Sequence, residues 1–267
     1  MTKQQERLLS NIKRIILLSS VSLMLLVTVM VFFRSRPSNW SNLRPNPYKE
    51  EDFVLQNGYM TCLAGESWLG VDVSHHQGSI RWDEVAASGV CFAMIRLGHR
   101  AVSDGVIRLD NYWEENFTGA RNAGLPVGVY FFSQATSVEE AKEEAAFVLK
   151  VLNGRGLELP VVFDWEDYFG NDRISNIDPE TVNACAIAFC EEIAKAGYEP
   201  MVYFNLDLAD RFWDLETIQQ QGYSFWLAMY RNTMSWPYAA KMWQYTETGR
   251  VAGIDTPVDL NLYFPEG

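Results

Sequence analysis

The segment Val161-Val162-Phe163-Asp164-Trp165-Glu166-Asp167 decides both the fold and the place of the functional site. Its apolar start is typical of a strand buried in a parallel sheet, and two carboxylates follow with one residue between them. Residues i and i+2 of a strand share a face and are separated by roughly 6.6 Å of rise, so Asp164 and Glu166 should project together while Trp165 points away. Loops leaving parallel strands converge on one rim, which these acids mark.

The same alternation runs along most of the chain. Short runs rich in Val, Ile and Phe alternate with segments of helical spacing, as in βα units around a parallel sheet. Eight strands are predicted, at residues 69–73, 91–97, 127–132, 160–164, 201–204, 225–229, 242–245 and 258–262. Two helices have clear starts, at Ser137 and Asp178, whereas helices become scarce after residue 215. The sequence therefore predicts an α/β fold, an irregular TIM-barrel-like (β/α) barrel with fewer helices in its C-terminal third.

The charges divide the chain into a basic tail and an acidic body. Residues 1–36 contain six Lys or Arg and one Glu, and the rest contains 16 basic and 33 acidic residues. An acidic body lacks the basic stripe of a nucleic-acid groove, so no nucleic-acid partner is expected.

Residues 15–33 are the candidate for a membrane span. The run has no charged residue, its length suits a bilayer core, and basic residues flank it on both sides. We therefore expect residues 1–14 to be a short cytoplasmic tail and 15–33 an uncleaved signal anchor of a single-pass protein of the cell membrane. The body would then be extracellular, and secretion after signal cleavage is the alternative.

Residues 34–67 are expected to form a linker or stalk and an irregular lead-in, because Pro, Asn and Ser are frequent near their start. The catalytic domain would then span residues 68–267. The sequence leaves a Cys62–Cys91 disulfide open. Cys185 and Cys190 would face apart on a helix and are not expected to pair. The alternative for Cys91, Cys185 and Cys190 is burial as apolar thiols.

Two further acids are predicted to face the same rim. Asp72 closes the first strand, and Asp259 lies in the last strand, which neighbours the first if the barrel closes. Crowded carboxylates repel one another and raise at least one pKa, which keeps an acid protonated near neutral pH. Paired acids of this kind cleave glycosidic bonds.

Less specific roles for these acids remain open. Any one of them alone can cap a helix or hold a loop, and Asp72 can serve as a Ca²⁺ or Mg²⁺ ligand. No imidazole or thiolate cluster accompanies the acids, so neither a metal site nor a cofactor is expected.

Aromatic side chains gather near the predicted strand ends. About half of them should belong to the core, and the others can cover the apolar face of a sugar ring or donate a hydrogen bond. The residues predicted to bind substrate are Tyr130, Tyr203, Tyr230, Trp243 and Gln244. His75 and His76 are interpreted as rim residues.

Four segments carry a resemblance to a known family. They are GVDVSHHQG (70–78), AGLPVGVYFF (123–132), PVVFDWE (160–166), and WQY (243–245) together with VDLN (258–261). In this order they resemble the motifs of glycoside hydrolase family 25, the lysozymes that cut peptidoglycan. The resemblance covers about residues 68 to 265.

The resemblance implies an irregular β/α barrel and N-acetylmuramidase activity on the β-1,4 bond from N-acetylmuramic acid to N-acetylglucosamine. Glu166 would be the general acid/base, and Asp164 would orient the substrate's acetamido group, whose carbonyl serves as the internal nucleophile. Asp72 and Asp259 would complete the acidic floor. One departure is Phe131, where many members carry His, and it would remove a polar contact from the rim.

We therefore expect a membrane-anchored peptidoglycan hydrolase with a monomeric catalytic domain that acts on glycan strands. The spacing of the acids does not decide between retention and inversion of the anomeric centre. The alternatives are a catalytically inactive glycan-binding protein and a chitinase-like hydrolase with a D-x-E barrel.

Overall fold

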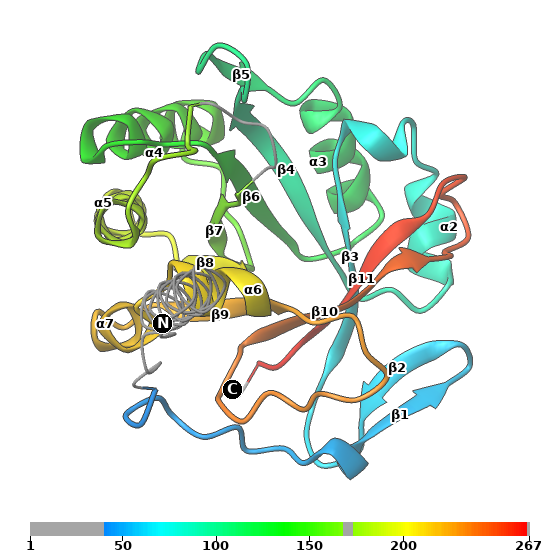
Figure 1. Cartoon of the computed structure of the whole chain (residues 1–267). Helices are drawn as coiled ribbons and strands as arrows, with labels where there is room; N and C mark the ends of the chain where they lie inside the picture. Colours follow the sequence, from blue (N-terminus) through cyan, green and yellow to red (C-terminus); the bar gives the residue numbers. More distant parts are fainter. Residues whose placement is uncertain (1–39, 168–172, 266–267) are drawn as a thin grey trace, which may run out of the picture. The chain divides into compact units, whose positions relative to one another are not determined.

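Eight strands close into a barrel in the computed structural model, which describes residues 40–167 and 173–265 (Figure 1). Their order around the barrel is β3, β4, β6, β7, β8, β9, β10 and β11, and β11 returns to pair with β3. In that order their bounds are Trp68–Val73, Phe92–Arg100, Val127–Ser133, Val161–Trp165, Pro200–Asn205, Ser224–Ala228, Met242–Gly249 and Val258–Tyr263. Each overlaps a predicted strand, so the prediction of an eight-stranded barrel is confirmed. A short strand β5 (Ile107–Leu109) pairs antiparallel with the end of β4, outside the barrel.

The last strand runs against both of its neighbours. The other seven strands are parallel, whereas β11 is antiparallel to β10 and to β3. No helix separates β10 from β11 to carry the chain back to the other end of the barrel. The expectation of a uniformly parallel sheet is therefore wrong at β11.

Helices cover the barrel where βα units are regular (Figure 1). They are α2 (Trp82–Ala87), α3 (Trp113–Asn122), α4 (Val138–Leu152), α5 (Pro179–Lys195), α6 (Leu206–Arg211) and α7 (Leu215–Gln220), with 3-10 turns η1 (Glu50–Asp52) and η2 (His75–Gln77). Ser137 caps α4 and Asp178 caps α5, as predicted. Between residues 221 and 265 the structure has no helix, in agreement with the predicted irregular third.

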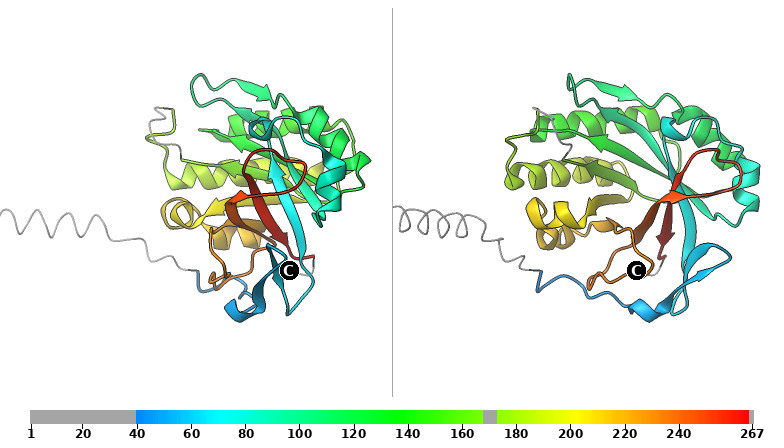
Figure 2. Two further views of the ribbon diagram at one scale, coloured as in Figure 1. Left: turned by 90° about the vertical axis from the view of Figure 1, so that its right-hand side faces the viewer. Right: turned by 45° about the vertical axis from the view of Figure 1, so that its right-hand side comes forward.

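Residues 40–62 cover the outer side of the barrel where helices are missing. Phe53 packs edge-on against Trp243 with ring centroids 5.1 Å apart, and the rings of Tyr48 and Phe264 are 5.0 Å apart. Both views in Figure 2 show this blue segment beside the C-terminal strands. The segment contains a hairpin of β1 (Phe53–Gln56) and β2 (Tyr59–Cys62).

Residues 40–67 belong to the same compact unit as the barrel, so the expectation of a linker or stalk and a lead-in outside the catalytic domain is wrong for them. The outer faces of β10 and β11 are apolar and need a cover, which this segment supplies. The predicted tail and anchor, residues 1–33, lie outside the described residues. Within residues 40–167 and 173–265, no helix is both long and apolar enough to cross a bilayer.

The core has two layers that explain where the polar site lies. Outward-facing side chains fill the space between the strands and their cover. Inward-facing side chains fill the barrel itself, and they are Phe92, Met94, Leu159, Val162, Met201, Tyr203, Trp226, Ala228, Met242 and Tyr263. Gly70 makes room for them, because a Cβ at this position would lie 2.2 Å from the Phe92 ring.

All four cysteines are free thiols, so Cys62 and Cys91 form no disulfide. Cys62, Cys185 and Cys190 are buried, as free cysteines commonly are. Cys91 is exposed, contrary to the buried alternative that the sequence analysis allowed.

Candidate active site

A cavity of about 600 Å³ opens at the carboxyl ends of the parallel strands, and all four predicted acids line it. Asp72 lies near the end of β3, Asp164 lies in β7 and Glu166 follows β7 directly. Asp259 is the second residue of β11 and lies directly opposite Asp72 in the strand register. A parallel β11 would place Asp259 at the other end of the barrel. The reversed strand therefore brings the fourth acid to the site.

Asp72 and Asp259 form a carboxylate pair that shares a hydrogen bond. Asp72 Oδ2 also accepts hydrogen bonds from Asn261 Nδ2 at 2.7 Å and from Gln244 Nε2 at 2.9 Å. Burial raises the pKa of Asp72, and these donors oppose the rise. Burial, and then the neighbouring charge of Asp72, raises the pKa of Asp259 to about 9. Asp259 therefore holds its proton at neutral pH, and the donors around Asp72 favour the charged form of that carboxyl.

Gln244 fixes the orientation of this pair. Its Nε2 donates to Asp72 and, at 3.3 Å, to Asp259 Oδ2. Its Oε1 accepts from Tyr203 Oη at 3.3 Å and from Tyr230 Oη at 3.2 Å. Both ends of the amide are therefore engaged with protein groups. Gln244 lines the cavity, as expected of a substrate-binding residue, and in this structure it also positions other side chains.

Glu166 has the environment of an acid that stays protonated near neutral pH. Burial is the main cause that raises its pKa to about 7, and the charge of Asp72 adds to the rise. Its neighbour Asp164 is more deeply buried, and burial, followed by the charges of Glu166 and Asp72, raises the pKa of Asp164 well above its ordinary value. Asp164 Oδ1 is buried and has no hydrogen-bond partner in the described part of the chain. A ligand in the cavity can supply the missing donor.

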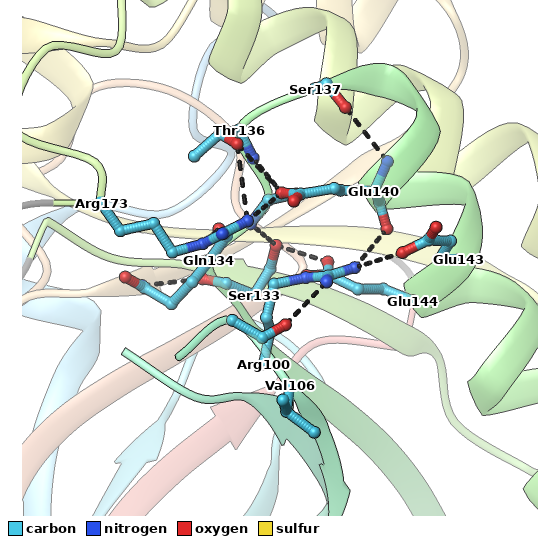
Figure 3. A network of polar contacts seen from close by, with 12 residues as sticks. Arg100, Val106, Ser133, Gln134, Thr136, Ser137, Glu140, Glu143, Glu144 and Arg173 are labelled. Carbon is cyan, nitrogen blue, oxygen red and sulfur yellow. Dashed lines mark hydrogen bonds and ion pairs between the residues drawn. The ribbon is translucent and has the colours of Figure 1, made fainter. Parts of the chain in front are cut away.

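A polar network around Gln134, shown in Figure 3, lies beneath the rim, and Gln134 also binds the backbone of Glu166. Gln134, fully buried, donates from Nε2 to the carbonyl oxygens of Ser133 at 2.9 Å and of Glu166 at 2.8 Å, which joins the ends of β6 and β7. Arg173 Nε donates to the Gln134 carbonyl at 3.3 Å, and its guanidinium forms an ion pair with Glu140 at the start of α4.

A buried ion pair anchors the same network to the barrel wall. Arg100 Nε donates to Glu144 Oε1 at 2.7 Å, and Ser133 Oγ donates to Glu144 Oε2 at 2.6 Å. Burial raises the pKa of Glu144 to about 7, against the opposing influence of Ser133 and Arg100. Both oxygens of this buried carboxylate have partners, and removing one partner would leave a buried charge uncompensated, which destabilises the fold. The network therefore gives β6 and α4 a fixed geometry below Glu166.

The cavity has a cationic side at its rim. Arg96 lines the cavity and pairs with buried Asp110 at 2.7 Å, and the His75 ring also contacts Asp110 at 3.3 Å. The Arg96 charge opposes the rise in the pKa of Asp164. His75 and His76 lie at the rim as predicted.

Two residues that the sequence analysis placed at the rim lie on the outer face of the barrel. Trp243 is fully buried outside it, where its Nε1 donates to the Met229 carbonyl at 2.8 Å. The prediction that Trp243 binds substrate is therefore wrong. Phe131 is also fully buried in the outer layer, so its difference from histidine does not affect the rim. In both cases the residue is one position out of phase with an inward-facing neighbour.

The structure adds residues that the sequence analysis missed. Trp226 lines the cavity and donates from Nε1 to Asn261 Oδ1 at 2.9 Å, which orients the amide that binds Asp72. Tyr130, Tyr203 and Tyr230 line the cavity as predicted. After Ser224 the strand containing Trp226 is apolar and buried at every position, so hydrophobicity does not show which of its faces is inward. Among the described residues no group of three or more His, Cys, Asp or Glu side chains could hold a metal ion.

The barrel and its carboxylate-lined mouth define a glycoside hydrolase, in which one acid protonates a leaving oxygen while others stabilise charge at the anomeric centre. Residues 71–254 match glycosyl hydrolases family 25. The chain therefore belongs to this family, which confirms the family and the class of enzyme predicted from the sequence.

Individual relatives agree with this family. The chain is 26% identical over 212 residues to lysozyme M1 of Streptomyces globisporus, across 73% of this chain and 67% of the relative. The solved lysozyme of Streptomyces coelicolor has a TM-score of 0.61 and 25% identity, across 76% of this chain and 94% of that one. The modular autolysin LytC of Streptococcus pneumoniae, at 22% identity and a TM-score of 0.67, shares the fold, across 79% of this chain. This chain spans about half of LytC, 52% of its length.

Proposed function

We propose that this chain is a lysozyme that hydrolyses the β-1,4 bond between N-acetylmuramic acid and N-acetylglucosamine in peptidoglycan. The buried, unpartnered Oδ1 of Asp164 beside a protonated Glu166 supports this proposal most directly. An N-acetyl sugar offers an amide N–H for Asp164 and a glycosidic oxygen for Glu166. A sugar with a 2-hydroxyl in place of the acetamido group would still offer Asp164 an O–H donor, but it would have no carbonyl oxygen to bond to C1.

The reaction would proceed with assistance from the substrate. The acetamido N–H donates to Asp164, which stabilises its ionised form, and the resulting negative charge favours the protonated form of Glu166. Glu166 gives this proton to the leaving oxygen as the bond from that oxygen to C1 breaks. The acetamido carbonyl oxygen bonds to C1 and forms a cyclic oxazolinium ion.

The second half of the reaction returns the enzyme to its starting state. Glu166, now a carboxylate, takes a proton from a water molecule that attacks C1, and the ring oxygen of the oxazolinium ion leaves C1 to restore the acetamido group. Two displacements at C1 retain the anomeric configuration. ¹H NMR of the first product tests this step, because the β-anomer is expected before mutarotation and an initial α-anomer would indicate inversion.

Asp72 and the residues that hold it would set the pKa of Glu166. The single negative charge of the Asp72–Asp259 pair raises the pKa of Glu166 and stabilises positive charge at C1 in the transition state. Gln244 holds this pair in place, and Tyr203 and Tyr230 orient Gln244. Tyr130 and the exposed ring of Tyr230 would contact the sugar faces.

Product analysis tests the bond that is cut. Purified peptidoglycan is digested, reduced with borohydride and analysed by mass spectrometry. New reducing ends on muramic acid are expected. Reducing ends on glucosamine would instead identify a glucosaminidase or chitinase-type activity, and binding without release of any product would identify an inactive glycan-binding protein.

We also propose that residues 15–33 anchor the protein in the cell membrane with the barrel outside the cell. The support is the uncharged run between basic flanks. Protease added to intact protoplasts should remove the barrel and leave an N-terminal fragment in the membrane. Recovery of the barrel in the medium, with a new N-terminus after residue 33, would instead support secretion.

A further inference from the structure

Tyr230 lines a second cavity, of about 550 Å³, in addition to the one that holds the acids. We call it the hairpin cavity, because the β1–β2 hairpin forms one of its walls. The other walls come from the loop after β9 and from β10 and the turn that follows it. Side chains that line it include Leu55, Tyr59, Arg231, Thr246, Thr248 and Arg250.

Hydrogen bonds join the hairpin to β10 and to the turn that follows it. Residues 53–62 lie outside the segment that matches the family, residues 71–254. Tyr245 Oη accepts a hydrogen bond from the Met60 N–H at 3.4 Å, and Tyr59 Oη donates to the Arg250 carbonyl at 3.4 Å. The hairpin is therefore fixed to β10, and the cavity exists before any ligand binds.

The chemistry of the hairpin cavity is opposite to that of the acid-lined cavity. Its described lining contains no Asp or Glu, and it contains two arginines in a body with 33 acidic and 16 basic residues. Arg231 donates to the neutral Ser235 Oγ at 3.2 Å, and neither arginine forms an ion pair with a carboxylate in the described part of the chain. Guanidinium groups bind carboxylates with paired hydrogen bonds. Leu55, with an exposed fraction of 67%, adds an apolar surface.

We propose that the hairpin cavity binds the acidic stem peptide of the peptidoglycan strand whose sugars occupy the acid-lined cavity. This inference rests on the proposed function. The stem peptide leaves the muramic acid at its lactyl group, close to the bond that is cut, and it carries carboxylates and alanine methyl groups. Arg231 and Arg250 would bind the carboxylates, and Leu55 would contact a methyl group. Uncharged sugar units would give the two guanidinium groups no ionic partner.

The experiment removes the arginine charges from the enzyme and, separately, the carboxylate charges from the stem peptides. The full-length chain, purified in detergent, is assayed on soluble glycan strands with intact stem peptides. It is also assayed on the same strands after carbodiimide coupling to ammonia, which converts the peptide carboxylates to amides. The test variant is Arg231→Gln/Arg250→Gln. The matched control is Lys142→Gln/Lys150→Gln, which removes two exposed charges from α4.

On native strands the arginine variant should have a KM raised roughly three- to tenfold, since each exposed ion pair contributes a modest factor. Its kcat should stay unchanged. On amidated strands the arginine variant and the wild type should have the same KM, and this KM should match that of the variant on native strands. The lysine variant should behave as the wild type on both substrates. Leu55→Glu should raise KM more on native than on amidated strands, because the new carboxylate repels the peptide carboxylates, whereas the lost methyl contact affects both substrates.

Two results would overturn this inference while the proposed function stands. One is an active wild type with no difference between the arginine variant and the lysine control. The other is an equal loss for the arginine variant on native and amidated strands, which would indicate a sugar in the cavity. A wild type that releases no reducing ends from either substrate would overturn the proposed function itself.

Discussion

Removing the shared charge of the Asp72–Asp259 pair should lower the pH at which activity is lost. Glu166 must be protonated to act, so kcat/KM should fall as pH rises through its pKa of about 7. The full rise of this pKa, from 4.5 to about 7, corresponds to about 3.4 kcal/mol. Burial is the larger cause, so the Asp72 charge accounts for less than half, at most about 1.2 pH units.

The proton held by the pair makes single and double variants differ. In Asp72→Asn burial still raises the pKa of Asp259, but the influence of the neighbouring charge is lost, so this pKa falls from about 9 and ionised Asp259 is expected to keep negative charge in the site. This variant should shift the basic limb of the pH profile of kcat/KM by less than about 0.4 pH units, a minor part of the rise that the Asp72 charge gives the pKa of Glu166. Asp72→Asn/Asp259→Asn removes the charge and should shift the limb downward by about 1 pH unit.

The assay is the pH dependence of kcat/KM on soluble labelled peptidoglycan, from pH 4 to pH 9. Exposed Asp210 on α6 provides the control, because Asp210→Asn also removes one charge and Asp210 does not line the cavity. An unmoved basic limb in the double variant would show that Asp72 does not raise the pKa of Glu166. An equal shift in the single and double variants would show that the pair shares no proton.

Three further substitutions test the supports of the site. Gln134→Ala removes the donor shared by the carbonyl oxygens of Ser133 and Glu166, at a cost of about 1–3 kcal/mol for the buried Ser133 carbonyl. Its kcat should fall with little change in KM, and kinetics and calorimetry check the two effects. Trp243→Ala should lower the free energy of unfolding by about 3–5 kcal/mol and leave KM unchanged, whereas a sugar contact would raise KM. Gly70→Ala drives a methyl group into the Phe92 ring and should cost about 1–3 kcal/mol or more, measured by urea unfolding.

The sequence predicted the strands and the acids of β7 well because their signals are local. An apolar run followed by acids at i and i+2 specifies both a buried strand and a shared face, and this pattern placed Asp164 and Glu166 correctly. Trp243 was misplaced because β10 is buried on both faces. Hydrophobicity therefore does not show that Gln244, and not its neighbour, faces inward.

Features that depend on distant parts of the chain were not predictable in this way. The position of Asp259 depends on the reversed direction of β11, which follows from the missing helix before it. The role of residues 40–62 depends on the same missing helices, because the hairpin covers the strands that they leave bare. A composition rich in Pro, Asn and Ser indicated a linker. It carried no information about the apolar outer faces of β10 and β11, which this segment covers.

The most direct test of the central claim compares two neighbouring carboxylates after β7. Glu166→Gln should lower kcat on purified peptidoglycan by about 10²- to 10⁴-fold, the contribution of a positioned general acid, while binding to the wall and the melting temperature are kept. Asp167→Asn, at the adjacent acid that pairs with Arg211 outside the cavity, should keep nearly full activity. Wild-type turnover by Glu166→Gln would contradict the claim that this acid, among the four at the barrel mouth, delivers the proton.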